Sequence, residues 1–145
     1  MSKIEPDKCR AFLMDYYFYF DYNRLIFSQN NNIGRKEMGD QINFVSIHKK
    51  PNIHFNGLSI SYVLECEDGM IKTLGVLRPS EKPLTFQAHV NEVIEIVHGN
   101  CRVKVGEEIE FEHYAAGERF TVLANQRFSM WADEVVDYIC HLDAH

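Results

Sequence analysis

The residues best suited to chemistry are His89, Glu92 and Glu95, which fall within a span of seven positions. Side chains of these types can transfer protons, hold sugar hydroxyls or stabilise a cationic sugar carbon. They lead into alternating apolar and polar residues that end on Gly106, a pattern typical of strands in a small β-barrel. A charge that faces an apolar interior costs free energy unless it is paired or used. Spacing alone leaves open whether Glu92 does chemistry or pairs with a lysine or arginine at the barrel rim.

Strand alternation predicts which of these side chains share a face. Glu92 falls on the same face as Ile94, and Glu95 falls on the other face with Val93. The two carboxylates are therefore not expected to work as a pair in the manner of glycosidases. Glu92 is instead a single carboxylate at the head of an apolar face.

A metal site at this position would need further histidines beside the glutamate. Positions 85–88 hold threonine, phenylalanine, glutamine and alanine, so only His89 remains nearby. One histidine and one carboxylate do not make a closed or catalytic metal site. We predict no bound metal, and a metal-dependent sugar or keto-acid enzyme is the third of three hypotheses.

The composition predicts one cytoplasmic domain without nucleic-acid or membrane partners. The chain has 145 residues, a net charge of −6 and no basic cluster that would bind a phosphate backbone. It lacks an apolar stretch of the roughly 20 residues needed to cross a bilayer, and its first residues lack the apolar core of a signal peptide. None of the four cysteines has the CxxC spacing of a zinc site, so we expect reduced thiols. Cys101 and Cys140 fall on apolar strand faces, which favours a core position for both.

The chain changes character near residue 50. Residues 1–50 form an aromatic-rich N-terminal extension, for which helix is preferred over strand because Glu5-Pro6-Asp7 resembles a helix start. We expect it to pack on the main domain or on a partner subunit. An alternative is that translation begins at Met38, so that the preceding residues are not part of the protein.

Residues 51–145 read as a β domain throughout. Short strand candidates separated by glycines or polar turns suggest an all-β fold, a cupin-like small β-barrel or jelly roll. The candidates are residues 60–65, 71–77, 92–99, 101–106, 109–114, 119–124, 127–132 and 135–142.

Residues 52–142 resemble the pyrimidine/purine nucleoside phosphorylases, a family of small single-domain cupins. The resemblance is carried by HFNG, TLGVL, PLTFQAHVNEVIEIVHGNCRVKVG, YAAGERFTVLANQRFSM and DEVVDYICHL in this order and spacing. It implies phosphorolysis, in which a nucleoside and inorganic phosphate give a free base and a pentose 1-phosphate. It implies no cofactor beyond phosphate as co-substrate, and we expect a homodimer.

The resemblance also implies roles for individual residues. Glu92 matches the family glutamate and would stabilise positive charge at C1′ of the ribose or hold its hydroxyls, while His89 would help the departing base. The aromatic residues that would line the base site are Phe86, Phe128 and Tyr138. Basic residues that would hold phosphate are Lys72 and His141. Core packing is the alternative for the aromatic residues.

The second hypothesis is a non-catalytic cupin that binds a small metabolite or serves as an interaction module. It is favoured by Val93, which stands where the family has a charged neighbour of the glutamate, and by Leu58, where a lysine is common.

Overall fold

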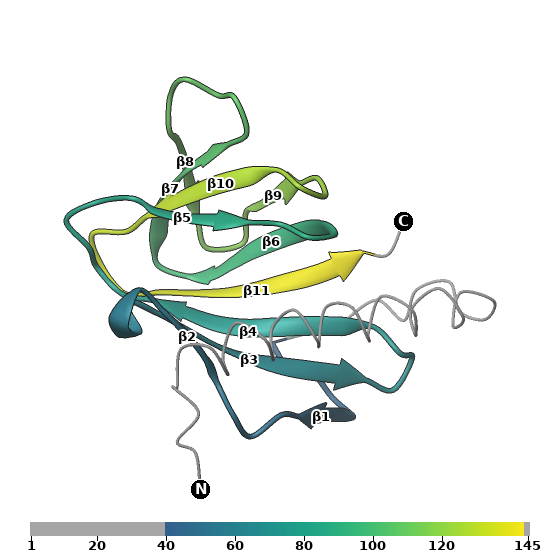
Figure 1. The fold of residues 1–145 in the computed structure, drawn as a ribbon. Helices are drawn as coiled ribbons and strands as arrows, with labels where there is room; N and C mark the ends of the chain where they lie inside the picture. Colours follow the sequence, from purple (N-terminus) through teal and green to yellow (C-terminus); the bar gives the residue numbers. More distant parts are fainter. Residues whose placement is uncertain (1–39, 144–145) are drawn as a thin grey trace, which may run out of the picture.

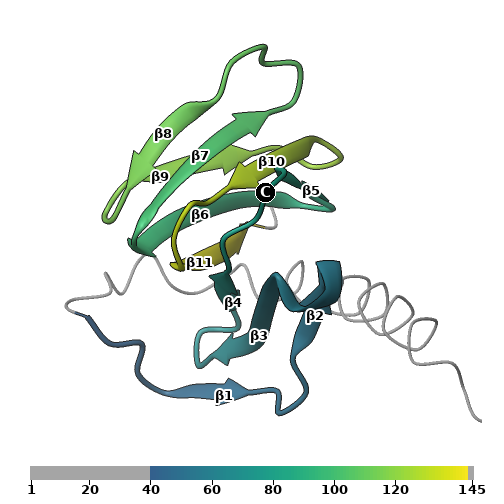
Figure 2. The same cartoon turned by 90° about the vertical axis from the view of Figure 1, so that its left-hand side faces the viewer.

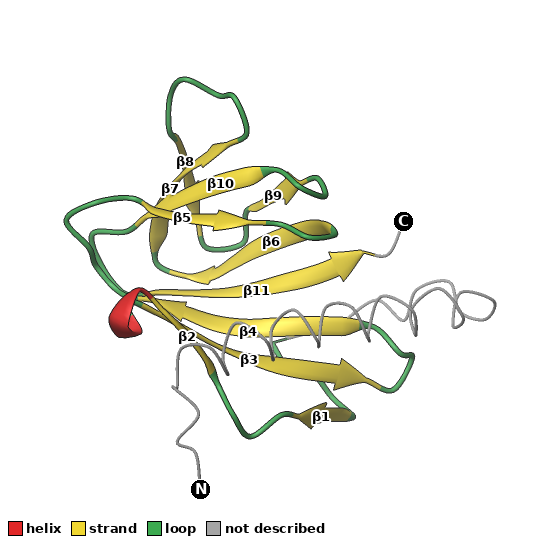
Figure 3. Cartoon of the chain, viewed as in Figure 1, coloured by secondary structure: helices red, strands yellow, loops and turns green. Residues whose placement is uncertain are grey.

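The computed structural model describes residues 40–143, and predictions that concern residues 1–39 lie outside this range. The described chain is almost entirely β-strand, with one short 3-10 helix, η1 (Figure 3). No helix within it is long and apolar enough to cross a membrane. The elements are β1 (Val45–Ile47), β2 (Asn52–His54), η1 (Phe55–Gly57), β3 (Ser59–Cys66), β4 (Ile71–Leu77), β5 (Leu84–Gln87), β6 (Asn91–His98), β7 (Asn100–Val105), β8 (Glu112–Ala115), β9 (Arg119–Val122), β10 (Arg127–Trp131) and β11 (Val136–Asp143).

The strands form two antiparallel sheets. The large, seven-stranded sheet has the order β1-β3-β4-β11-β6-β9, with β2 also paired to β3, and the small sheet has the order β5-β10-β7-β8. Figure 1 shows the small sheet above the β6 and β11 end of the large sheet, and Figure 2 shows β1 at the opposite end of the molecule from β8. This arrangement confirms the predicted all-β class. The two sheets do not close into one continuous barrel within the described residues.

Each predicted strand overlaps an observed one, with differences at the edges. The predicted strand at 109–114 begins later, because β8 starts at Glu112. The sequence prediction missed β1, β2 and β5, which are three or four residues long. β1 lies in the segment predicted as an extension, yet it pairs with β3, with Val45 opposite Cys66. The large sheet therefore takes in residues before position 51.

Alternation along the strands separates the two faces of the large sheet. One face, here called the interior face, packs against the small sheet; the other is the outer face. On β6 the interior face carries Glu92, Ile94 and Ile96, all buried. On β11 it carries Tyr138, Cys140 and Leu142, also buried. The buried positions of Cys101 and Cys140 confirm the prediction that both thiols lie in the core.

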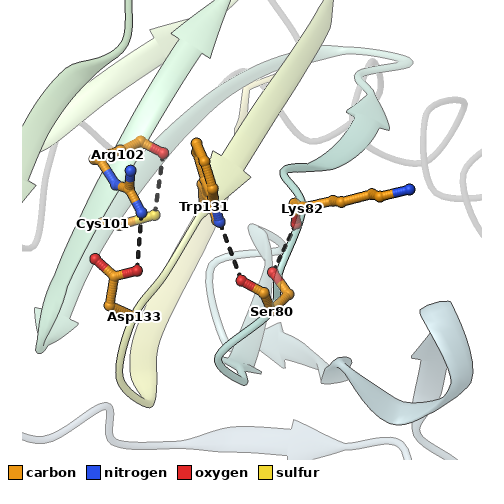
Figure 4. Close-up of polar contacts among 6 residues, drawn as sticks. All are labelled: Ser80, Lys82, Cys101, Arg102, Trp131 and Asp133. Carbon is orange, nitrogen blue, oxygen red and sulfur yellow. Dashed lines mark hydrogen bonds and ion pairs between the residues drawn. The ribbon is translucent and has the colours of Figure 1, made fainter.

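A cluster around Trp131 ties β7, β10 and the loop before β5 together on the outer side of the small sheet (Figure 4). The Arg102 guanidinium lies 3.9 Å from the Trp131 ring centroid and pairs with Asp133 at 2.9 Å. The Trp131 indole N–H donates to the Ser80 carbonyl at 3.1 Å. These contacts fix β7, the strand that carries Cys101, at the edge of the core.

Gly75 on β4 makes room for Tyr138 on β11. The two residues are opposite each other in the register of these strands. A Cβ added at Gly75 would lie 2.6 Å from the Tyr138 hydroxyl oxygen and closer still to the ring. The glycine is thus required by a close approach, because the ring lies against the backbone of the neighbouring strand.

Gly75→Ala should lower the free energy of unfolding by about 2 to 4 kcal/mol, since the buried ring has to move. Urea denaturation monitored by tryptophan fluorescence measures this. The matched control is Leu74→Ala, one position away on the outer face, where the side chain is 41% exposed and the loss should stay within about 1 kcal/mol. A stable Gly75→Ala protein would contradict the packing described here.

Candidate functional site

Glu92 is a buried carboxyl group on the interior face of the large sheet. It lies near the start of β6, and its cross-strand neighbours are Val122 on β9 and Leu142 on β11, both apolar and buried. Its side chain is 7% exposed. Within residues 40–143, no lysine or arginine forms an ion pair with it, so the alternative of a rim salt bridge is not what the structure shows.

The partner of Glu92 is a thiol. Cys140 Sγ donates a hydrogen bond to Glu92 Oε2 over 3.3 Å. Burial raises the pKa of Glu92 to about 7, and the hydrogen bond from Cys140 opposes part of that rise. Near neutral pH the carboxyl group is therefore close to half ionised, which is the state in which a side chain can both hold charge and exchange a proton.

Tyr138 shares the interior face with Cys140. Burial raises the pKa of Tyr138 to about 12, so its hydroxyl stays protonated. The same cause raises the pKa of Cys140 well above its ordinary value. Among these three interior groups, only Glu92 changes its charge near pH 7.

The two predicted stacking residues on the small sheet pack on each other. Phe86 and Phe128 have ring centroids 5.4 Å apart and an angle of 22° between their planes. The ring centroids of Phe55 and Phe86 are 5.2 Å apart in a T-shaped arrangement, and those of Phe120 and Phe128 are 6.3 Å apart. The rings thus form one continuous aromatic row, and a base would contact its margin rather than lie between Phe86 and Phe128.

The other predicted catalytic residue, His89, differs from Glu92 in burial. It occupies the turn between β5 and β6 and is exposed, whereas Glu92 three positions later is buried. The structure therefore brings Glu92 and Tyr138 to one interior face and places His89 in an exposed turn.

Lys72 and His141, predicted to hold phosphate, lie on the outer face. They are opposite each other in the β4–β11 register. The His141 imidazole Nε2 is 3.1 Å from Glu95 Oε2, and the Arg119 guanidinium is 2.7 Å from the same oxygen. Burial lowers the pKa of both Lys72 and His141, and Glu95 opposes the effect. The sheet separates this outer cluster from Glu92, so the structure does not bring the predicted phosphate and catalytic residues together.

Sequence reasoning missed the contact between Cys140 and Glu92. It placed both side chains on apolar faces, which was correct, but the two residues are 48 positions apart and meet only through strand pairing. The sequence held one indication of this contact. Cys140 and Glu92 both fall on apolar strand faces, and a thiol can donate a hydrogen bond to a carboxylate. No cluster of three or more His, Cys, Asp or Glu side chains in the described part of the chain is placed to hold a metal ion.

The fold and the carboxyl group define an all-β protein with a titratable acid on its interior sheet face. The profile of the family described as pyrimidine/purine nucleoside phosphorylase matches residues 49–142. The chain belongs to this family. A relative of that name from Acinetobacter baylyi is 48% identical over 103 residues, which are 71% of this chain and 95% of the relative. One from Cupriavidus taiwanensis is 38% identical over 71% of this chain and 96% of its own length.

Solved structures agree with the fold. A crystal structure from Acinetobacter sp. ADP1, described as a protein of unknown function, has a TM-score of 0.70 at 48% identity and covers 71% of this chain and 98% of its own. A second such protein, from Vibrio parahaemolyticus, has a TM-score of 0.60 at 29% identity and covers 66% of this chain and 97% of its own.

The raised pKa of Glu92 predicts that wild-type stability falls as pH rises. The unfolded chain releases this proton near pH 4.5 and the folded protein near pH 7, so stability is lost across this window. The loss attributable to Glu92 should total about 3 kcal/mol. Glu92→Gln cannot titrate, so the stability of this variant relative to wild type should rise by about that amount between pH 5 and pH 8.

Chemical denaturation of both proteins at several pH values measures this difference. Glu95→Gln, on the outer face of the same strand, is the control, and its difference from wild type should not follow the same curve. A gap between Glu92→Gln and wild type that stays constant from pH 5 to pH 8 would show that Glu92 is not the buried titrating group.

Proposed function

We propose that the protein is a broad-specificity nucleoside phosphorylase, which cleaves purine and pyrimidine nucleosides with inorganic phosphate. The family and the relatives' names support this class of reaction. The observation that carries the proposal is Glu92, a buried carboxyl group with a pKa of about 7 on the interior face. A group so placed is costly to keep and is therefore a candidate for function.

In the proposed reaction the bond between C1′ and the base nitrogen breaks and the base leaves with the electron pair. A phosphate oxygen forms the new bond to C1′ from the opposite side, and the base nitrogen takes up a proton. C1′ gains positive charge as the base departs, and ionised Glu92 stabilises it or holds the ribose hydroxyls. His89, exposed at the turn before β6, is the candidate donor to the departing base.

Broad specificity is consistent with the aromatic residues that the structure gathers in one row. The aromatic row of Phe55, Phe86 and Phe128 offers flat apolar surface. Stacking on such a surface does not depend on a fixed pattern of hydrogen bonds, so purines and pyrimidines can both be accepted. The buried Tyr138 hydroxyl, which stays protonated, is the nearby polar group that can orient a ligand.

The proposed reaction does not depend on Lys72 and His141. Within one chain, a phosphate held by these side chains would be separated from a ribose at Glu92 by the large sheet. We further propose a cytoplasmic homodimer that needs no cofactor besides phosphate as co-substrate, a state that light scattering and assays without added metal can check.

The second candidate is a non-catalytic cupin that binds a small metabolite. The stacking of Phe86 directly on Phe128 favours it, because two rings in contact leave no slot between them for a base. A nucleoside that raises the melting temperature without being cleaved would support this function instead.

Incubation of the purified protein with uridine or adenosine and phosphate tests the proposal, with free base measured by chromatography. Release of base should require phosphate. Glu92→Gln should lower kcat/KM by about 100-fold or more, because it removes the charge at C1′. Glu95→Gln is the matched control, because it makes the same substitution on the same strand but on the outer face. Its activity should stay within about threefold of wild type. Absence of phosphate-dependent release for every common nucleoside would refute the proposal.

A further inference from the structure

We propose that Cys140 is a positioning residue, which holds Oε2 of Glu92 so that Oε1 is the oxygen presented to the ribose. This inference rests on the proposed function. The contact that supports it is direct: the thiol and the carboxyl group are 3.3 Å apart, and both side chains are more than nine-tenths buried.

The geometry of the sheet makes Cys140 the neighbour of Glu92 on this face. Cys140 lies opposite Ile94 on β6, one interior position from Glu92, and the residue directly opposite Glu92 is the apolar Leu142. The thiol therefore reaches the carboxyl group along the diagonal of the β6–β11 pair. On the other side of Glu92, β9 contributes the apolar Val122.

A third strand flanks the donor on the side away from Glu92. Thr73 on β4 lies opposite Cys140 in the register of β4 and β11. Burial raises the pKa of the Cys140 thiol, the neighbouring Glu92 carboxyl group adds to the rise, and Thr73 opposes part of it. Thr73, Cys140 and Glu92 thus lie on three adjacent strands, β4, β11 and β6. The thiol carries one proton, and Glu92 Oε2 is the acceptor of its hydrogen bond.

The consequence is a carboxylate with two different oxygens. Oε2 accepts from the thiol, so Oε1 is left to meet a hydroxyl or a cationic carbon. The thiol also favours the ionised form of Glu92, because a hydrogen bond to a carboxylate stabilises its charge.

Other titratable groups on the interior side keep one charge state near neutral pH or lie further away. Burial raises the pKa of Tyr138 to about 12 and that of Cys101 to about 11, so both stay neutral. Glu65, at the far side of β3, is held by His48 at 3.1 Å. The ionisation of Glu92 should therefore respond to the donor at position 140.

Two substitutions separate positioning from packing. Cys140→Ala removes the donor, so Glu92 should ionise at a higher pH, whereas Cys140→Ser supplies a stronger O–H donor and should move ionisation to a lower pH. Both substitutions reduce the volume of the side chain, so a purely structural role would shift both variants in the same direction. Cys101 provides the control, because it is also buried and its thiol donates to the Arg102 carbonyl at 3.6 Å instead of to Glu92 (Figure 4).

The experiment is a ¹³C NMR titration of protein carrying carboxyl-labelled glutamate, with the Glu92 signal assigned by its absence in Glu92→Gln. The midpoint should rise by about 0.5 to 1 pH unit in Cys140→Ala and fall by a similar amount in Cys140→Ser. It should move by less than about 0.2 pH unit in Cys101→Ala. At pH 7, Cys140→Ala should lower kcat/KM for base release about two- to fivefold, with recovery at higher pH.

Midpoints that move together in the alanine and serine variants, or that do not move, would overturn the inference. Midpoints that move as expected while the pH dependence of base release does not follow would overturn the catalytic part of it. Absence of base release from the wild-type protein would refute the proposed function, and the titration would still decide whether Cys140 holds Glu92.

Discussion

The interior of this protein is organised around one constraint, the burial of a carboxyl group without a cation beside it. Glu92 has apolar neighbours on both adjacent strands and a thiol as its hydrogen-bond donor. A thiol is a weak donor, so it offsets only part of the cost of removing a carboxylate from water. The pKa of Glu92 is raised as a result, because the neutral form of the carboxyl group is compatible with the apolar core.

The other glutamate on β6 has the kind of partners that a carboxylate usually has in a folded protein. Glu95 lies three positions from Glu92 on the outer face, where it accepts from Arg119 and contacts His141. These contacts satisfy the charge at the sheet surface. The two glutamates lie on the same strand but on opposite faces of the large sheet. The difference between their environments therefore arises from the face on which each side chain lies. An interior acid without such partners is a group maintained at a cost, which is the physical reason for placing the chemistry at Glu92 rather than at Glu95.

The sequence predicted the features that depend on alternation and missed those that depend on pairing. The opposite faces of Glu92 and Glu95 and the burial of Cys140 followed from the two-residue period of strands. The outer position of His141 could have been inferred in the same way, because Cys140 and Leu142 flank it on the interior face. The bond from Cys140 to Glu92 could not, since it requires β11 to lie beside β6 in one particular register. β5 was missed because four residues, half of them polar, carry too little periodicity.

The most direct test of the central claim is the pH dependence of kcat/KM for phosphate-dependent base release by the wild-type protein. If Glu92 acts in its ionised form at the ribose, kcat/KM should rise with pH through a midpoint near 7. A rate without such a midpoint, or no phosphate-dependent release of base at any pH, would contradict a catalytic role for this carboxyl group.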